Sequence, residues 1–86
     1  MLAVIDYALQ AEKKECDGSE TGRKSLSSIQ ECAEHCSDKS KMFIYGRIGT
    51  DRCSNDGTCT CWCETEAKNG SCPEINHSGY NLYKYT

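Results

Sequence analysis

Apolar residues recur at helical spacing between Ser25 and Ser37, the most regular periodic stretch of the chain. One buried stripe of an α-helix is predicted by intervals of three and four residues among Leu26, Ile29, Cys32, Ala33 and Cys36. The pairs Ser27–Gln30 and Ser28–Glu31 both have the spacing of a capping box at a helix start. The pattern therefore predicts a helix over residues 25–37.

A second segment alternates strictly, which is typical of a β-strand with two different faces. Over residues 58–63, Cys59, Cys61 and Cys63 point one way, whereas Thr58, Thr60 and Trp62 point the other way. The apolar, β-prone run Met42–Tyr45 predicts a strand near the middle of the sheet.

The chain ends in a β-rich segment, Gly79–Thr86, which we expect to be a strand. Its alternation places Tyr80, Leu82 and Lys84 on one face and Asn81, Tyr83 and Tyr85 on the other. Residues 2–10 allow a strand or a helix, and residues 8–14 favour a helix by propensity. Turn signals predict connections at residues 16–22, 49–57 and 68–71, the last one as a hairpin turn.

The composition describes a small domain that needs cross-links. The chain has 86 residues, is 37% hydrophobic, and contains one Phe, one Trp and eight Cys. A thin core with this share of cysteine is typical of a secreted disulfide scaffold. The even count predicts four bridges, at Cys16, Cys32, Cys36, Cys53, Cys59, Cys61, Cys63 and Cys72, although spacing alone leaves the connectivity open.

Charge and hydropathy exclude several classes of partner. The net charge is −3 with both signs interspersed, so no basic block predicts nucleic-acid binding. No stretch is long and apolar enough to predict membrane insertion. The apolar run at residues 1–9 lacks a basic flank, so we expect it to belong to the mature fold of a secreted chain whose signal has been removed.

Two of the cysteine spacings fit each other. The C-x-x-x-C step at Cys32 and Cys36 places two sulfurs on one helix face, about 6 Å apart. Residues i and i+2 of the C-x-C strand lie about 6.6 Å apart. Two helix cysteines can therefore meet two strand cysteines at the separation of a disulfide. Zinc is the alternative use of these sulfurs with His35, but the paired C-x-x-C steps of zinc ribbons are absent, and no metal or cofactor is expected.

The segment Ser28–Cys36, followed by Met42–Gly46, resembles the helix and next strand of PAN/apple modules. Gly79–Tyr83 is similar to the closing strand of invertebrate members, and the resemblance covers about residues 16–86. It implies an extracellular, non-enzymatic module that binds proteins or carbohydrates and that lays one helix across an antiparallel sheet. Ser40 and Lys41 stand where PAN modules often carry a further cysteine, which departs from their usual pairing.

The same two cysteine steps also resemble the cysteine-stabilised αβ scaffold of defensins and toxins. The chain is longer than most members of that group, it is acidic, and its Cys59, Cys61 and Cys63 run differs from their pattern. Both resemblances imply helix-to-strand bridges, with Cys32–Cys61 and Cys36–Cys63 as one possible pairing.

No assembled catalytic constellation is present, so the sequence predicts a protein that is not an enzyme. His35 is expected to be a partly exposed helix residue and His77 to lie in a polar loop. Glu64 and Glu66 are alternate strand residues without an indicated cleft. Two N-x-S sequons make Asn69 and Asn76, both expected in loops, possible glycosylation sites.

The candidate binding residues are aromatic and arginine side chains, which often dominate protein interfaces: Trp62, Tyr80, Tyr83, Tyr85, Arg47 and Arg52. The alternative is that the rings fill the second face of a thin sheet. Together these observations predict a single α+β domain over residues 1–86, with an N-terminal strand or arm at 1–15 and a cystine-linked core at 16–86. The expected function is secreted recognition of an extracellular protein or glycan. The alternatives are a toxin or host-defence polypeptide, or a secreted signalling ligand.

Overall fold

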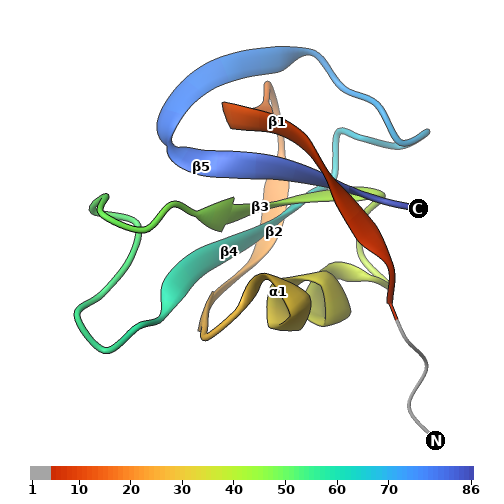
Figure 1. Cartoon of the computed structure of the whole chain (residues 1–86). Coiled ribbons are helices and arrows are strands. Elements are labelled where there is room, and N and C mark those ends of the chain that lie inside the picture. Colours follow the sequence, from red (N-terminus) through yellow and green to blue (C-terminus); the bar gives the residue numbers. More distant parts are fainter. Residues whose placement is uncertain (1–4) are drawn as a thin grey trace, which may run out of the picture.

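The computed structural model describes residues 5–86, which form a five-stranded antiparallel sheet with one helix on one face (Figure 1). The elements in chain order are β1 (Tyr7–Cys16), β2 (Glu20–Leu26), α1 (Ile29–Cys36), β3 (Met42–Gly46), β4 (Cys59–Glu64) and β5 (Glu74–Tyr85). Their order in the sheet is β1-β5-β3-β4-β2. The α+β prediction is confirmed at this level, although the sheet dominates because the helix has only eight residues.

The helix α1 begins later than the periodicity predicted. Leu26 belongs to β2, where it pairs with Cys59 of β4, because the edge of the sheet supplies hydrogen bonds that an extra helical turn would lose. Of the two possible capping boxes, the chain uses the second one. The Ser28 hydroxyl accepts a hydrogen bond from the Glu31 N–H at 3.1 Å, and the Glu31 carboxylate accepts one from the Ser27 N–H at 2.8 Å.

Substitution of Ser28 with alanine is expected to lower the free energy of unfolding by about 1 kcal/mol, because an orphan N–H of the first helical turn loses its acceptor. Ser27→Ala is the matched control, since Ser27 contributes its backbone N–H, which alanine keeps. Urea unfolding of both variants under non-reducing conditions measures the difference. Equal losses for the two variants would contradict this assignment of the cap.

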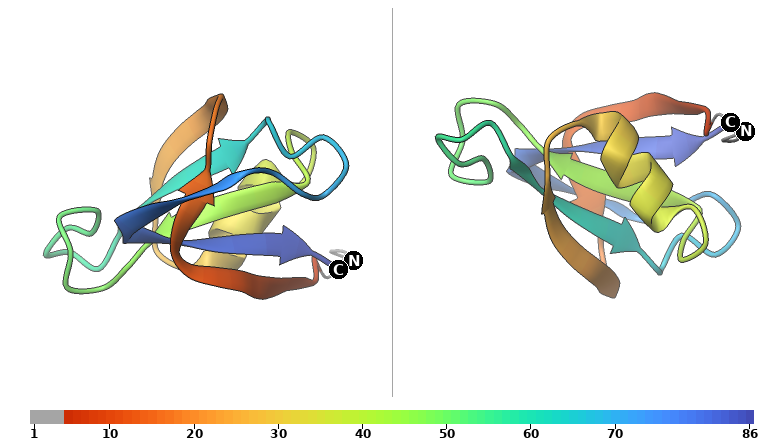
Figure 2. Two further views of the ribbon diagram at one scale, coloured as in Figure 1. Left: turned by 90° about the horizontal axis from the view of Figure 1, so that it is seen from above. Right: turned by 90° about the horizontal axis from the view of Figure 1, so that it is seen from below.

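Tyr7–Cys16 form the strand β1, and the helix propensity at residues 8–14 is overridden by pairing along β5. Residues 1–4 of the predicted N-terminal strand or arm lie outside the described residues. The ladder runs from Tyr7 opposite Tyr85 to Cys16 opposite Glu74, with irregularities at Leu9/Ala11 and Glu12/Lys14. Lys13 has a φ of 56°, which fits such a bulge. Both strands bend, so their far ends fold over the sheet face that α1 does not cover (Figure 2).

The sheet therefore has a core on each face, and every residue of β3 is buried between them. The core under α1 contains Phe43 stacked on Tyr83, with ring centroids 5.2 Å apart, and Tyr7 edge-on to Phe43. The second core contains six buried residues: Cys16, Met42, Ile44, Ala67, Tyr80 and Leu82. These clusters confirm the predicted faces of the β4 and β5 segments, with the three β4 cysteines toward α1 and Trp62 away from it.

All eight cysteines form disulfides. Cys32–Cys61 and Cys36–Cys63 fasten α1 to β4 and match the pairing that both resemblances implied. Cys16–Cys72 joins the end of β1 to the connection before β5, and Cys53–Cys59 closes the loop before β4. The bridges thus lie under the helix, across the second core and in the loop after β3.

Two expectations about the second half of the chain are wrong. The turn at residues 68–71 does not close a hairpin, because β3 lies between β4 and β5 and the connection has to cross it. Asn76 and His77 were expected in loops but lie in β5, since the start of that strand pairs with the far end of β1. The central position predicted for β3 is confirmed. No helix within residues 5–86 has the length and apolar character needed to cross a membrane.

Candidate binding groove

An open groove of about 450 Å³ lies beside the first turn of α1. Its walls come from the start of α1, the end of β3, the loop at residues 47–58 and β5. Its lining includes the side chains of Ser28, Ile29, Tyr45, Arg47, Ile48 and Tyr83. The groove therefore combines aromatic and aliphatic surface with one guanidinium group.

The loop that forms one wall is held against the sheet by backbone contacts. A Cβ added at Gly46 would lie 2.7 Å from the Arg52 carbonyl oxygen, so the return of the loop past the end of β3 requires glycine there. The Arg47 N–H donates to the Gly79 carbonyl at 2.8 Å, and the Thr60 N–H donates to the Arg52 carbonyl at 2.8 Å. The loop thus sets the positions of Arg47 and Ile48 at the groove.

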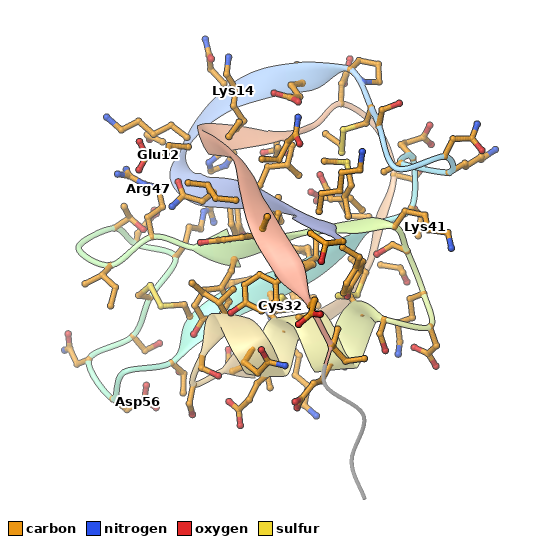
Figure 3. All side chains as sticks on the ribbon, turned by 45° about the vertical axis from the view of Figure 1, so that its right-hand side comes forward. Glu12, Lys14, Cys32, Lys41, Arg47 and Asp56 are labelled. Carbon is orange, nitrogen blue, oxygen red and sulfur yellow. A yellow bond between two sulfur atoms is a disulfide. The ribbon has the colours of Figure 1, made fainter. Side chains whose placement is uncertain are left out.

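Arg47, which is labelled in Figure 3, and its chain neighbour Ile48 both line the groove. Arg47 donates from Nη1 to the Ser78 carbonyl at 3.2 Å, but its Nε–H is buried without a partner. Ile48 is 88% exposed, the largest exposure among the big apolar side chains of residues 5–86. The groove thus presents a positively charged side chain next to exposed aliphatic surface.

The two tyrosines of the groove are fixed and uncharged. The Tyr45 hydroxyl donates to the Leu26 carbonyl at 2.6 Å, and burial raises the pKa of Tyr45. Burial also raises the pKa of Tyr83, although its hydrogen bond with Asn81 and the nearby Arg47 charge oppose the shift. Both rings therefore serve as neutral, rigid walls at physiological pH.

The other predicted binding residues lie elsewhere. Tyr80 and Arg52 meet on the opposite sheet face, where the guanidinium carbon lies 5.5 Å from the ring centroid, and Trp62 packs against the second core. Tyr85 donates its hydroxyl to the Ala33 carbonyl at 2.5 Å, which ties β5 to α1. These contacts support the core-filling interpretation for Trp62, Tyr80 and Tyr85, and the structure brings only Arg47 and Tyr83 together at the groove.

The structure also shows where the two sequon residues and the two histidines lie. Asn69 is exposed in the turn after β4, as expected. Asn76 is also exposed but lies in β5, where its side-chain oxygen accepts a hydrogen bond from Lys14 Nζ at 2.6 Å. His77 lies in β5 rather than a loop, with Nε2 3.5 Å from a Glu15 carboxylate oxygen. His35 is in α1, half-buried, with Nε2 2.7 Å from the Gly22 carbonyl oxygen.

A buried carboxyl group was missed by the sequence analysis. Glu64 has no exposed surface, and its Oε2 accepts a hydrogen bond from the Cys16 N–H at 2.6 Å. When both carboxyl groups are charged, its Oε1 and the Oε2 of its cross-strand neighbour Glu20 are buried and neither receives a hydrogen bond. Burial, together with the hydrogen bond to Glu20, raises the pKa of Glu64 to about 9. A proton shared by the two carboxyl groups satisfies both orphan oxygens, because a protonated acid donates where a carboxylate cannot.

The alternation that placed Trp62 away from the cysteines also places Glu64 on that face, so part of the signal was present. Nothing in the pattern predicted that β1 and β5 would cover it. Glu66, the expected companion of Glu64, lies in the exposed turn after β4. Because Glu64 has no exposed surface, we assign the Glu20–Glu64 pair an effect on stability and none on a ligand.

Within residues 5–86, one group of side chains has the spacing of a metal site. The sulfurs of Cys32, Cys36 and Cys61 lie within 4.8 Å of one another and are buried. Each is oxidised in a disulfide, so none is the thiolate that zinc binds. Their closeness follows from two disulfides packed side by side between α1 and β4.

Comparison of the chain with family models, curated proteins and solved structures found no match. The PAN/apple and defensin resemblances therefore stay predictions.

Proposed function

We propose that this protein is a secreted, non-enzymatic recognition module, similar to PAN/apple modules, that binds an extracellular protein or carbohydrate in the groove beside α1. The observation that carries the proposal is the groove itself. It places the exposed Ile48 next to the guanidinium of Arg47, the only charged side chain among the described residues that line the groove. The exposed aliphatic surface and the positive charge both gain contacts when another molecule covers the groove.

The disulfides support an extracellular location, because cross-links of this number persist in oxidising compartments. They also support a recognition role. The Cys32–Cys61 bridge fixes the α1 wall of the groove to β4, and Cys53–Cys59 closes the loop that carries the opposite wall. A groove held in this way loses little conformational entropy on binding.

A screen on arrays of glycans and extracellular proteins tests the proposal, followed by variants of the two exposed isoleucines. We expect Ile48→Ser to weaken the captured interaction at least tenfold, because it removes apolar surface at the centre of contact. Ile75→Ser is the matched control, since Ile75 is 42% exposed on β5 and does not line the groove. Both variants should unfold within about 0.5 kcal/mol of the parent, as is usual for surface substitutions.

Two results would count against this function. One is the absence of any binder on both arrays. The other is a binder whose affinity falls with Ile75→Ser but is unchanged with Ile48→Ser, because the contact would then lie away from the groove.

A further inference from the structure

The groove carries a positive charge. Among the described residues that line it, Arg47 is the only charged side chain. The others are small, amide, hydroxyl-bearing, aliphatic or aromatic residues. The protein as a whole carries a net charge of −3, so this positive position stands out against an acidic background.

Within residues 5–86, Arg47 forms no ion pair with a carboxylate. Two acidic residues that neighbour groove-lining positions in the sequence are engaged with the backbone. The Glu31 carboxylate accepts from the Ser27 N–H at 2.8 Å and caps α1. The Asp56 carboxylate accepts from the Thr58 N–H at 2.9 Å and from its hydroxyl at 2.7 Å. Asp56 lies at the tip of its loop, well away from Arg47 (Figure 3). The Arg47 guanidinium is therefore available to an anion that arrives with a ligand.

The aromatic part of the groove favours a protein ligand over a sugar. Sugars commonly bind by laying a ring on an open aromatic face. Tyr45 and Tyr83 are only 6% and 7% exposed, and the Tyr83 ring is stacked on Phe43. The accessible apolar surface is instead aliphatic, at the 88% exposed Ile48, which suits an aliphatic side chain.

We infer that the groove binds a segment of a partner protein that presents a carboxylate beside an aliphatic side chain. The carboxylate pairs with the Arg47 guanidinium that lines the groove, and charge-assisted bonds of this kind are among the strongest in proteins. The aliphatic side chain packs between Ile48 and Tyr45. This inference rests on the proposed recognition function and specifies the chemistry of its ligand.

Two small probes test the carboxylate directly. N-acetyl-leucine and N-acetyl-leucinamide share an aliphatic side chain and differ in the carboxylate alone. Titrations of the ¹⁵N-labelled protein, followed by two-dimensional NMR, should show saturable shifts at Arg47, Ile48 and Gly57 with N-acetyl-leucine. We expect a dissociation constant at least fivefold higher for the amide.

Variants then assign the effect to the guanidinium. Arg47→Gln should remove the difference between the two probes, whereas Arg23→Gln, which removes an exposed arginine of β2 outside the groove, should preserve it. Equal binding of the two probes, shifts confined to other surfaces, or no shifts would overturn the inference. A glycan from the array that occupies the groove would also overturn it, yet would leave the proposed function intact. The proposed function itself fails only if the groove variant Ile48→Ser leaves binding unchanged or no binder exists.

Discussion

Replacing Glu64 with glutamine is expected to stabilise the protein at pH 8 by roughly 3–5 kcal/mol and to abolish most of the pH dependence of its unfolding. Glutamine has the shape of a protonated glutamic acid. Its carbonyl can accept the Cys16 N–H, and its amide can donate to the orphan oxygen of Glu20. The variant therefore keeps both hydrogen bonds without needing a proton.

The sign of this stability change follows from the difference between the pKa of Glu64 in the folded state and in the unfolded state. Burial, with the Glu20 hydrogen bond, raises this pKa to about 9 in the folded protein, against 4.5 for an ordinary glutamate. Between these pH values the folded chain holds a proton that the unfolded chain has released. The stabilisation linked to that proton is complete below the unfolded pKa and is lost as the pH rises through the folded pKa, at about 1.4 kcal/mol per pH unit.

Other charged groups face the pair and shape its titration. Glu15 of β1 has its pKa raised by burial and by Glu20, while His77 of β5 and Arg52 of the loop lower it. These neighbours belong to elements that pack around Glu64 and are unchanged in the glutamine variant. The comparison between parent and variant at each pH thus isolates Glu64.

Urea unfolding at pH 5, 6.5 and 8 under non-reducing conditions measures the effect. The gap between Glu64→Gln and the parent should be below about 1 kcal/mol at pH 5 and should widen steadily to pH 8. Glu12→Gln, at an exposed position of β1, is the control and should follow the parent at every pH. Parallel profiles for parent and Glu64→Gln would show that Glu64 does not carry the proton.

Removing the Cys32–Cys61 bridge, by alanine at both positions, is expected to lower the free energy of unfolding by about 3.5 kcal/mol or more. The bridge closes a loop with a sequence separation of 29, and both residues are fully buried. The Cys53–Cys59 bridge has a separation of only 6, and Cys53 is only half-buried. Its double alanine variant should lose about 2 kcal/mol, because a short loop restricts the unfolded chain less.

Urea unfolding of both double variants tests the order, and each variant serves as the control for the other. The first should also show weakened contact between α1 and β4, visible as faster hydrogen exchange in α1. The second should leave α1 exchange unchanged. A larger loss from Cys53–Cys59 than from Cys32–Cys61 would contradict the assignment of the helix clamp as the main cross-link.

The sequence predicted the features that depend on residues close together in the chain, namely the position of α1 and the two faces of the strands. Helical spacing located α1, and alternation gave the correct faces to Cys61, Trp62 and Tyr83, because side-chain direction follows from backbone geometry. The central position of β3 followed from its continuous apolar run. Of the predicted binding residues, Arg47 and Tyr83 line the groove.

The remaining features depend on contacts between distant segments. The bend of β1 and β5 places Cys16 over the sheet and buries Glu64, but its pairing joins residues that are far apart in the sequence. The groove arises because the loop after Arg47 returns beside α1, which no local periodicity encodes. The sequence alone therefore did not indicate that β1 and β5 bury Glu64.

The fold and the groove depend most on four particular cross-links, two of which clamp α1 to β4. Disulfide mapping of the purified protein by mass spectrometry, with partial reduction to separate Cys59, Cys61 and Cys63, tests this claim directly. The predicted result is a mass about 8 Da below that of the reduced chain and the pairs Cys16–Cys72, Cys32–Cys61, Cys36–Cys63 and Cys53–Cys59. Free thiols at Cys32 and Cys36, or a different partner for either of them, would contradict it.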